Sequence, residues 1–159
     1  MNISDRFGIG ALGVALVIGV SASKGPASEP AATSDITVTR QANFKKLGAA
    51  NKAIGDELKK DAPDIAVARA QAPVIAGLAP QVVDWFPVGS GVESGTETEA
   101  LPAIWERRAE FDRRAQALVD ASAALQTASA SGDLPGVRTA SAAVGAACKS
   151  CHTDFRAKK

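Results

Sequence analysis

Apolar residues recur at every third or fourth position along four long stretches of the chain, with polar residues between them. This spacing places the apolar side chains on one face of an α-helix. The pattern predicts helices over residues 35–60, 64–85, 102–130 and 134–157. Four amphipathic helices joined mostly by short links predict an all-α protein, folded as an antiparallel four-helix bundle.

Prolines and glycines mark the interruptions in this pattern. Pro73 and Pro80 lie inside the second stretch, where each removes a backbone donor and predicts a kink or a break. Residues 86–101 contain Pro87 and several glycines and have no apolar period, so we expect a long loop there. Asp133 directly precedes the fourth stretch and is expected to cap it.

The start of the chain has the features of a targeting segment. Residues 7–20 form an apolar run of about fourteen residues after Arg6, which is short for a membrane span and typical of a signal peptide. We expect a signal peptide over 1–23, with an uncleaved membrane anchor as the alternative, and a disordered linker over 24–33. The bundle is then residues 34–159, and export indicates a location in the periplasm.

Composition and charge narrow the functional classes. The 159 residues include 18 lysines and arginines and 17 acidic residues, spread along the chain, for a formal net charge of +1. No basic stripe is present to bind a phosphate backbone, so we expect no nucleic-acid partner. No pair of acid and base residues stands out either, and we do not expect an enzyme.

The only two cysteines stand in the sequence Cys148-Lys149-Ser150-Cys151-His152. Cys-x-x-Cys-His is the attachment pattern of a c-type haem. On a helix, the two cysteines and the histidine share one face, so two thiols can add to the porphyrin vinyl groups and the imidazole can reach the iron. We expect one covalent haem c with His152 as the metal ligand, while Lys149 and Ser150 face away.

Three other uses of these residues are weaker alternatives. A structural zinc site needs four protein ligands, and the motif supplies three. A thioredoxin-like dithiol needs a strand before its helix, and none is readable. A plain disulfide remains possible, but it closes a very small ring.

The second axial position of the iron can be judged from the amino-acid inventory. His152 is the only histidine, and Met1, at the start of the export segment, is the only methionine. Neither bis-histidine nor histidine–methionine coordination is therefore possible within the bundle. We expect five-coordinate, high-spin iron, unless a lysine, an asparagine or water binds weakly.

Four pieces of the sequence, in this order, carry a resemblance to a known family. They are residues 40–44 (RQANF), 85–91 (WFPVGSG), 102–105 (PAIW) and 144–156 (VGAACKSCHTDFR). They resemble the cytochrome c-prime family, the class II cytochromes c, over roughly residues 35–159. The resemblance implies an antiparallel four-helix bundle with its haem motif near the C-terminus, located in the bacterial periplasm and often a homodimer.

Carried over by position, the resemblance also implies further haem contacts. Arg40 and Gln41 would lie at the haem edge, with Arg40 near a propionate, because a guanidinium can pair with both carboxylate oxygens. Phe44 would cover the distal face, where low-spin relatives place a methionine. Arg156 would lie near the proximal imidazole, and Trp105 beside the haem. Each residue also has a plainer interpretation, as a core aromatic or a solvated cation.

Two functions are consistent with these features. The family resemblance favours electron transfer with redox partner proteins. The open iron position favours binding of a diatomic gas, nitric oxide or carbon monoxide, as the alternative.

Overall fold

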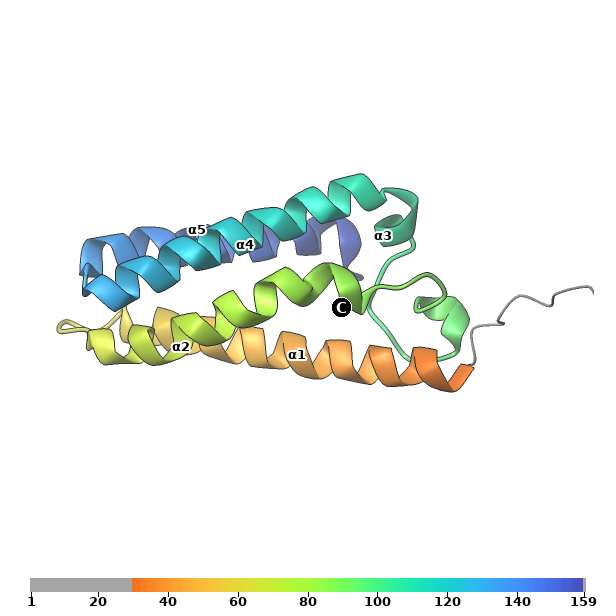
Figure 1. Ribbon diagram of the computed structural model, residues 1–159, viewed down its shortest axis with the longest axis horizontal. Coiled ribbons are helices and arrows are strands. Elements are labelled where there is room, and N and C mark those ends of the chain that lie inside the picture. The colour runs from red at the N-terminus through yellow and green to blue at the C-terminus, as the bar shows by residue number, and fades with distance from the viewer. Residues whose placement is uncertain (1–29, 159) are drawn as a thin grey trace, which may run out of the picture.

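The computed structural model describes residues 30–158, with side chains from residue 35 onward. Within this range the long helices are α1 Pro30–Glu57, α2 Ile65–Leu78, α4 Arg108–Ser131 and α5 Leu134–Phe155. Shorter elements are the 3₁₀ helices η1 Ala79–Trp85 and η2 Val92–Ser94 and the single turn α3 Ala103–Glu106. The long helices pack as an antiparallel bundle (Figure 1), so the predicted fold class is confirmed.

The first helix begins earlier than the apolar pattern indicates. Residues 30–33, expected in the linker, belong to α1, and the predicted start at Asp35 is too late. The predicted signal peptide or anchor, 1–23, lies outside the described residues. Of the helices that are described, none is long and apolar enough to cross a membrane.

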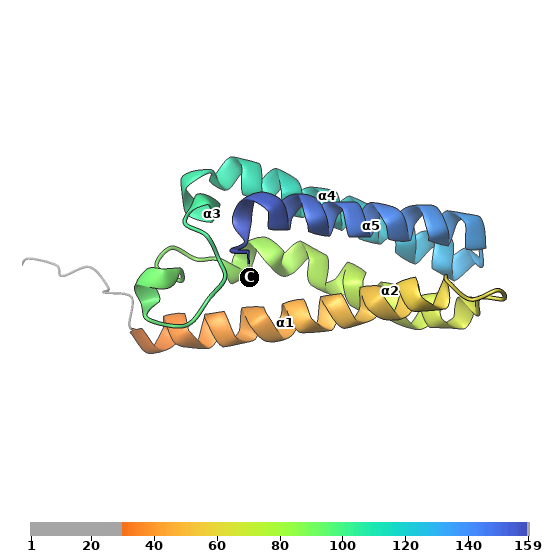
Figure 2. The same cartoon turned by 180° about the vertical axis from the view of Figure 1, so that it is seen from behind.

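Around the bundle the order of helices is α1, α2, α4, α5. Helix α2 packs against both α1 and α4, and α4 packs along α5. Of these four contacts between neighbouring long helices, the one between α1 and α5 is the smallest. Figures 1 and 2 show α1 and α5 diverging toward the end at which α5 stops. This arrangement leaves one end of the bundle less tightly closed than the other.

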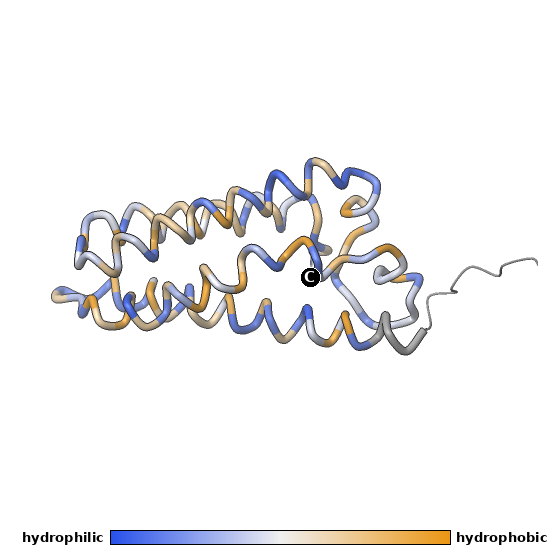
Figure 3. Tube along the Cα trace, in the orientation of Figure 1, coloured by the Kyte–Doolittle hydropathy of each residue, from blue (hydrophilic) through white to orange (hydrophobic). Residues whose placement is uncertain are grey.

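The core follows from the amphipathic pattern of the helices. Figure 3 shows apolar and polar residues alternating along each long helix. The side chains that are almost completely buried come from every long helix and from α3: Ile54, Ile75, Ile104, Phe111, Leu125, Val137 and Val144. Burial of such side chains is the main stabilising contribution to a bundle of this size.

Helix ends are set by local side-chain chemistry. Asp133 accepts a hydrogen bond from the Gly136 backbone N–H at 3.1 Å and caps α5 as predicted. Asp64 caps α2 through a 2.8 Å bond from the Ala66 N–H. Gly132 ends α4 with φ of 81°, a left-handed conformation that favours glycine.

The second predicted helix is divided at one of its two prolines. The regular α2 helix continues through Pro73, which lies on its exposed side. It ends at Leu78, and the chain tightens into the 3₁₀ helix η1 at Pro80, which has no N–H to donate. The break expected from the prolines therefore occurs at Pro80.

The third predicted helix is also two helices, which the apolar pattern did not indicate. Arg107 has φ −117° and ψ 45°, outside the helical region, and separates α3 from α4. On one side of this break, Trp105 Nε1 donates to the Pro87 carbonyl at 3.0 Å. On the other side, Arg108 Nη1 donates to the Phe86 carbonyl at 3.1 Å. Both sides are anchored to the same loop, so tertiary contacts fix the bend.

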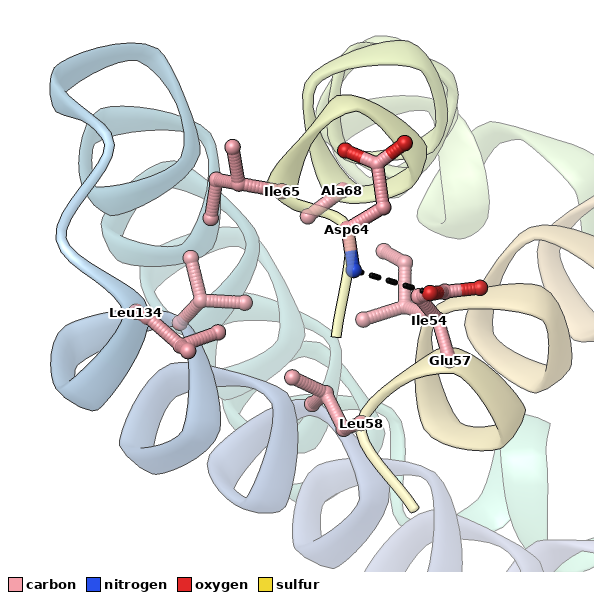
Figure 4. A pocket seen from close by; sticks show the side chains of 8 residues that line it. Ile54, Glu57, Leu58, Asp64, Ile65, Ala68 and Leu134 are labelled. Atoms are coloured by element: carbon pink, nitrogen blue, oxygen red, sulfur yellow. Dashed lines mark hydrogen bonds between the residues drawn. The ribbon is translucent and has the colours of Figure 1, made fainter. Parts of the chain in front are cut away.

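The tightly closed end of the bundle lies at the link between α1 and α2. The apolar side chains of Leu58, Ile65 and Leu134 line a small pocket there (Figure 4). The Asp64 backbone N–H donates to Glu57 Oε1 at 2.9 Å and fixes the link. This pocket lies at the start of α5, so it belongs to the fold and is remote from the cysteine motif at the other end of that helix.

Candidate haem-binding site

The cysteine motif lies in the last two turns of α5. Cys148, Cys151 and His152 occupy the helical positions that place them on one face. Both thiols are half-buried and pack against the edge of the hydrophobic core, whereas His152 is exposed. The motif therefore lies near the C-terminal end of α5, the end at which Figure 2 shows α1 and α5 diverging.

The state of the thiols bears on the alternative uses of the motif. Burial raises the pKa of the Cys148 thiol, and it raises the pKa of Cys151 to about 11 against a smaller opposing effect of the Arg114 charge. The two sulfurs are not joined in a disulfide. A reactive redox dithiol needs a lowered thiol pKa, so these protonated thiols do not support that alternative. In the described part of the chain, no three His, Cys, Asp or Glu side chains gather in a way that could hold a metal ion.

The surroundings of His152 favour its neutral imidazole form. Although the His152 side chain is exposed at the surface, partial desolvation by neighbouring atoms lowers its pKa, and the Arg156 charge lowers it further, while the Glu99 carboxylate opposes them. A lowered pKa favours neutral imidazole at neutral pH, and neutral imidazole is the metal-binding form.

Phe44 belongs to a chain of aromatic contacts that reaches the end of α5. Its ring meets Trp85 at 5.2 Å, nearly perpendicular, and Phe86 at 6.1 Å. The chain continues from Phe86 to Phe111 at 5.0 Å and from Phe111 to Phe155 at 5.4 Å. Phe44 is only partly buried. The structure thus places it at the same end of the bundle as the cysteine motif.

Arg40 is buried rather than solvated, with only 2% of its surface exposed. Its Nη2 donates to the Ser90 carbonyl at 3.0 Å and to Thr98 Oγ1 at 2.9 Å. Its Nη1 donates to the Trp85 carbonyl at 3.2 Å, and its Cζ lies 4.5 Å from the centre of the Phe86 ring. Arg40 therefore clasps the 86–101 loop onto α1, a role that the sequence did not indicate.

Gln41 and Arg156, the other two predicted residues, contact the end of the same loop. Gln41 Nε2 donates to the Glu97 carbonyl at 2.9 Å. Arg156 Nε donates to Glu99 Oε2 at 2.6 Å. Since Gln41 is on α1 and Arg156 follows α5, this stretch of loop joins the two helices that carry the predicted haem contacts.

Arg114 is a further candidate that sequence reasoning missed. Its Nη1 donates to the Ser150 carbonyl at 2.9 Å and to the Ser150 hydroxyl, and its Nη2 binds Asp154 and Glu110, each at 2.9 Å. Ser150, expected to face away with no role, is thus tied to α4. The i,i+4 spacing of Glu110 and Arg114 was the only local signal, and it does not reveal the partner on α5.

The residues present fit a haem. Arg40 does not itself decide this, because its guanidinium already donates to the Trp85 and Ser90 carbonyls and to Thr98 Oγ1, and the charge of Glu93 also acts on it. Phe44 on α1 and the two thiols on α5 remain half-buried. A planar apolar group held by the two thiols would cover part of the apolar surface that these side chains leave exposed.

Comparison with known proteins identifies the family. Residues 35–156 match the family model described as cytochrome c'. The chain belongs to the cytochrome c' family. Members bind haem c covalently, and Cys148 and Cys151 are its attachment residues in this cytochrome c'.

Individual relatives agree with this assignment. Cytochrome c' of Rhodopseudomonas palustris is 37% identical over 132 residues, which are 80% of this chain and 86% of that protein. The crystal structure of cytochrome c' from Thermochromatium tepidum has a TM-score of 0.74 at 29% identity, covering 79% of this chain and 97% of that one. A nitric oxide complex of a mutant cytochrome c prime from Alcaligenes xylosoxidans has a TM-score of 0.71 at 30% identity, covering 84% and 100%.

Proposed function

We propose that this cytochrome c' holds five-coordinate haem iron through His152 and binds a diatomic gas, nitric oxide or carbon monoxide, on the opposite face. One observation carries the proposal: the sequence has a single histidine and a single methionine, Met1, which precedes the bundle. No second strong axial ligand therefore comes from the bundle. The nitric oxide complex of the Alcaligenes relative supports the choice of gas.

Phe44 is the side chain that would restrict this face. It projects from α1 and is held by edge-to-face contact with Trp85. An aromatic ring fixed in this way admits a small linear ligand only by crowding it. We therefore assign Phe44 to discrimination against ligands, and the chain of contacts from Phe44 to α5 keeps the ring in place.

Electron transfer is the second candidate function. It is favoured by the surface position of the site, since Gln41, which would lie at the haem edge, is exposed. The haem supplies a redox-active iron, and an edge near the surface allows exchange with partner proteins. In this proposal residues 1–23 direct export to the periplasm, and the protein assembles as a homodimer there. The proposal includes no enzymatic turnover.

The chain's own residues have distinct tasks in either function. Arg40 would neutralise a propionate while holding the loop, and Gln41 would lie at the haem edge. Arg156 would lie beside the proximal imidazole. Arg114 fixes the helical turn between the two attachment cysteines through its bonds to Ser150 and Asp154.

The visible spectrum of the ferrous holoprotein, with and without carbon monoxide, tests the proposal. We expect a high-spin spectrum that converts when the gas is added. A sharp low-spin spectrum that ignores the gas would show that a side chain fills the sixth position, and it would leave electron transfer as the function.

The role of Phe44 has its own test in the carbon monoxide affinity of variants. Phe44→Ala should bind the gas roughly tenfold more tightly, because crowding of about 1–3 kcal/mol is relieved. Phe44→Leu keeps much of the bulk and should lie between. Val38→Ala removes an exposed apolar side chain from the same helix and should change nothing. An unchanged affinity in Phe44→Ala contradicts the screening role.

A further inference from the structure

Residues 97–101 form a strap that touches both helices beside the haem site. On the α1 side, the Glu97 carbonyl accepts a 2.9 Å hydrogen bond from Gln41, and Thr98 Oγ1 accepts one of 2.9 Å from Arg40. Arg40 is nearly completely buried whereas Gln41 is exposed, so the Arg40 bond is the part of this attachment that is better shielded from water.

On the α5 side, the strap pairs with the chain as it leaves the helix. Ala100 and Arg156 form an isolated antiparallel bridge. The Leu101 N–H donates to the Phe155 carbonyl at 3.1 Å, and the Ala157 N–H donates to the Glu99 carbonyl at 2.8 Å. Backbone bonds therefore fix the strap directly against Arg156.

Arg156 itself has no helical constraint. Helix α5 stops at Phe155, and Arg156 has an extended backbone with φ −122° and ψ 134°. Its side chain is 45% exposed, so its four-residue distance from His152 does not by itself hold the guanidinium near the imidazole. A long exposed arginine side chain samples many rotamers unless a partner holds it.

Glu99 supplies that partner. Its Oε2 accepts from Arg156 Nε at 2.6 Å, and its own backbone carbonyl is bonded to the residue after Arg156. The backbone bonds on both sides of Glu99 keep its backbone next to that of Arg156, so the carboxylate starts within reach of the guanidinium.

We propose that Glu99 is the positioning residue of Arg156: it holds the guanidinium beside the proximal His152, and Arg156 influences the haem iron only while this carboxylate is present. The inference rests on the proposed function, in which His152 is the iron ligand and Arg156 lies beside its imidazole. It adds a residue from the loop, far from the motif in sequence, to the determinants of the haem's properties.

A double-mutant cycle on the full-length holoprotein tests this role through the midpoint reduction potential. Arg156→Gln should lower the potential, because a cation that favours ferrous iron is removed and Glu99 is left unpaired. At a fixed potential the ferric-to-ferrous ratio should change about twofold to fivefold, as expected for half-exposed charges. In the Glu99→Gln background, Arg156→Gln should cause little further change, since the guanidinium is already loose.

Glu97→Gln is the matched control, because Glu97 lies in the same strap, is exposed, and binds Gln41 through its backbone only. Arg156→Gln should shift the potential as much in the Glu97→Gln background as in the wild type. If Arg156→Gln shifts the reduction potential equally in the wild-type and Glu99→Gln backgrounds, the proposal is overturned. It is also overturned if Arg156→Gln alone leaves the reduction potential of the wild type unchanged. The carbon monoxide spectrum of the same samples reports on the five-coordinate iron separately, so failure of the proposed function is recognised independently.

Discussion

Replacement of Arg40 by methionine is the perturbation with the largest predicted effect on the fold. Methionine retains much of the apolar stem of the side chain and removes the guanidinium. The change leaves the carbonyls of Trp85 and Ser90 without their charged donor, in a region that water does not reach. It also removes the stacking of the guanidinium on Phe86.

The magnitude follows from the bonds that are lost. The two shortest, to the Ser90 carbonyl and to Thr98 Oγ1, are 3.0 and 2.9 Å long, and a hydrogen bond from a charged donor contributes about 1.5–3 kcal/mol. Burial lowers the pKa of Arg40, which shows that the charged form is partly destabilised. Relief of this cost offsets part of the loss. We expect the free energy of unfolding to fall by roughly 2–4 kcal/mol, a large part of the stability of a domain this size.

Urea unfolding of the holoprotein, followed by far-UV circular dichroism, measures this loss. Arg40→Lys keeps the charge without the planar fork and should fall between the wild type and Arg40→Met. Gln41→Ala removes one exposed bond next to Arg40 and should cost less than about 1 kcal/mol. If Arg40→Met unfolds within about 0.5 kcal/mol of the wild type, the bonds merely balance the burial of the charge, and the clasp does not stabilise the loop.

Three further predictions concern stability. The hydrogen bond from Lys60 lowers the pKa of Glu57 in the folded protein below its ordinary 4.5, so the ionised carboxylate stabilises the fold fully above pH 4.5 and loses this effect as the pH falls through the folded-state pKa. The urea midpoints of the wild type and of Glu57→Gln should therefore converge in acid. A gap between the midpoints that stays constant with pH contradicts this prediction. Arg114→Met should cost about 1–2 kcal/mol in the same assay, and an unchanged midpoint would show that its bonds to α5 are fully screened. Gly132 has φ 81°, so Gly132→Ala should lower the free energy of unfolding by about 1–2 kcal/mol. Gly48 lies within a helix with open space around it, so Gly48→Ala should raise the free energy of unfolding by about 0.5–1 kcal/mol. Equal effects of the two substitutions would refute the left-handed cap at Gly132.

The helices could be predicted from the sequence because each long stretch is consistent over many turns. The Asp133 cap and the interruption at Pro80 depend on residues next to them in the chain, and both are confirmed. The break at Arg107 could not be predicted in this way. The apolar pattern continues across it, and the bend is set by Trp105 and Arg108, which both bind a loop whose position follows from the folded bundle.

The residues of the site also fall into a group that local sequence predicts and a group that depends on tertiary contacts. The motif on α5 was predictable because its chemistry depends on spacing within one helix turn. The surroundings of Arg40 and Arg114 were not, since their partners lie far away in the sequence. A positive charge on a helix gives no sign of whether it is solvated, pairs with a ligand or clasps a loop. Burial decides among these, and burial is a property of the assembled bundle.

The weak contact between α1 and α5 connects the chemistry of the haem to the stability of the fold. These two helices carry Phe44 and the attachment cysteines, and all three side chains stay half-buried although the remaining helix pairs are well packed. Half-buried apolar groups contribute only part of their possible stabilisation, roughly 25 cal/mol for each Å² that is covered. A haem attached to Cys148 and Cys151 would cover part of this surface and would bury apolar surface of its own. We therefore expect haem attachment in this cytochrome c' to add to the packing of its core, so that residues fixing the end of α5 should affect the iron and the stability of the fold together.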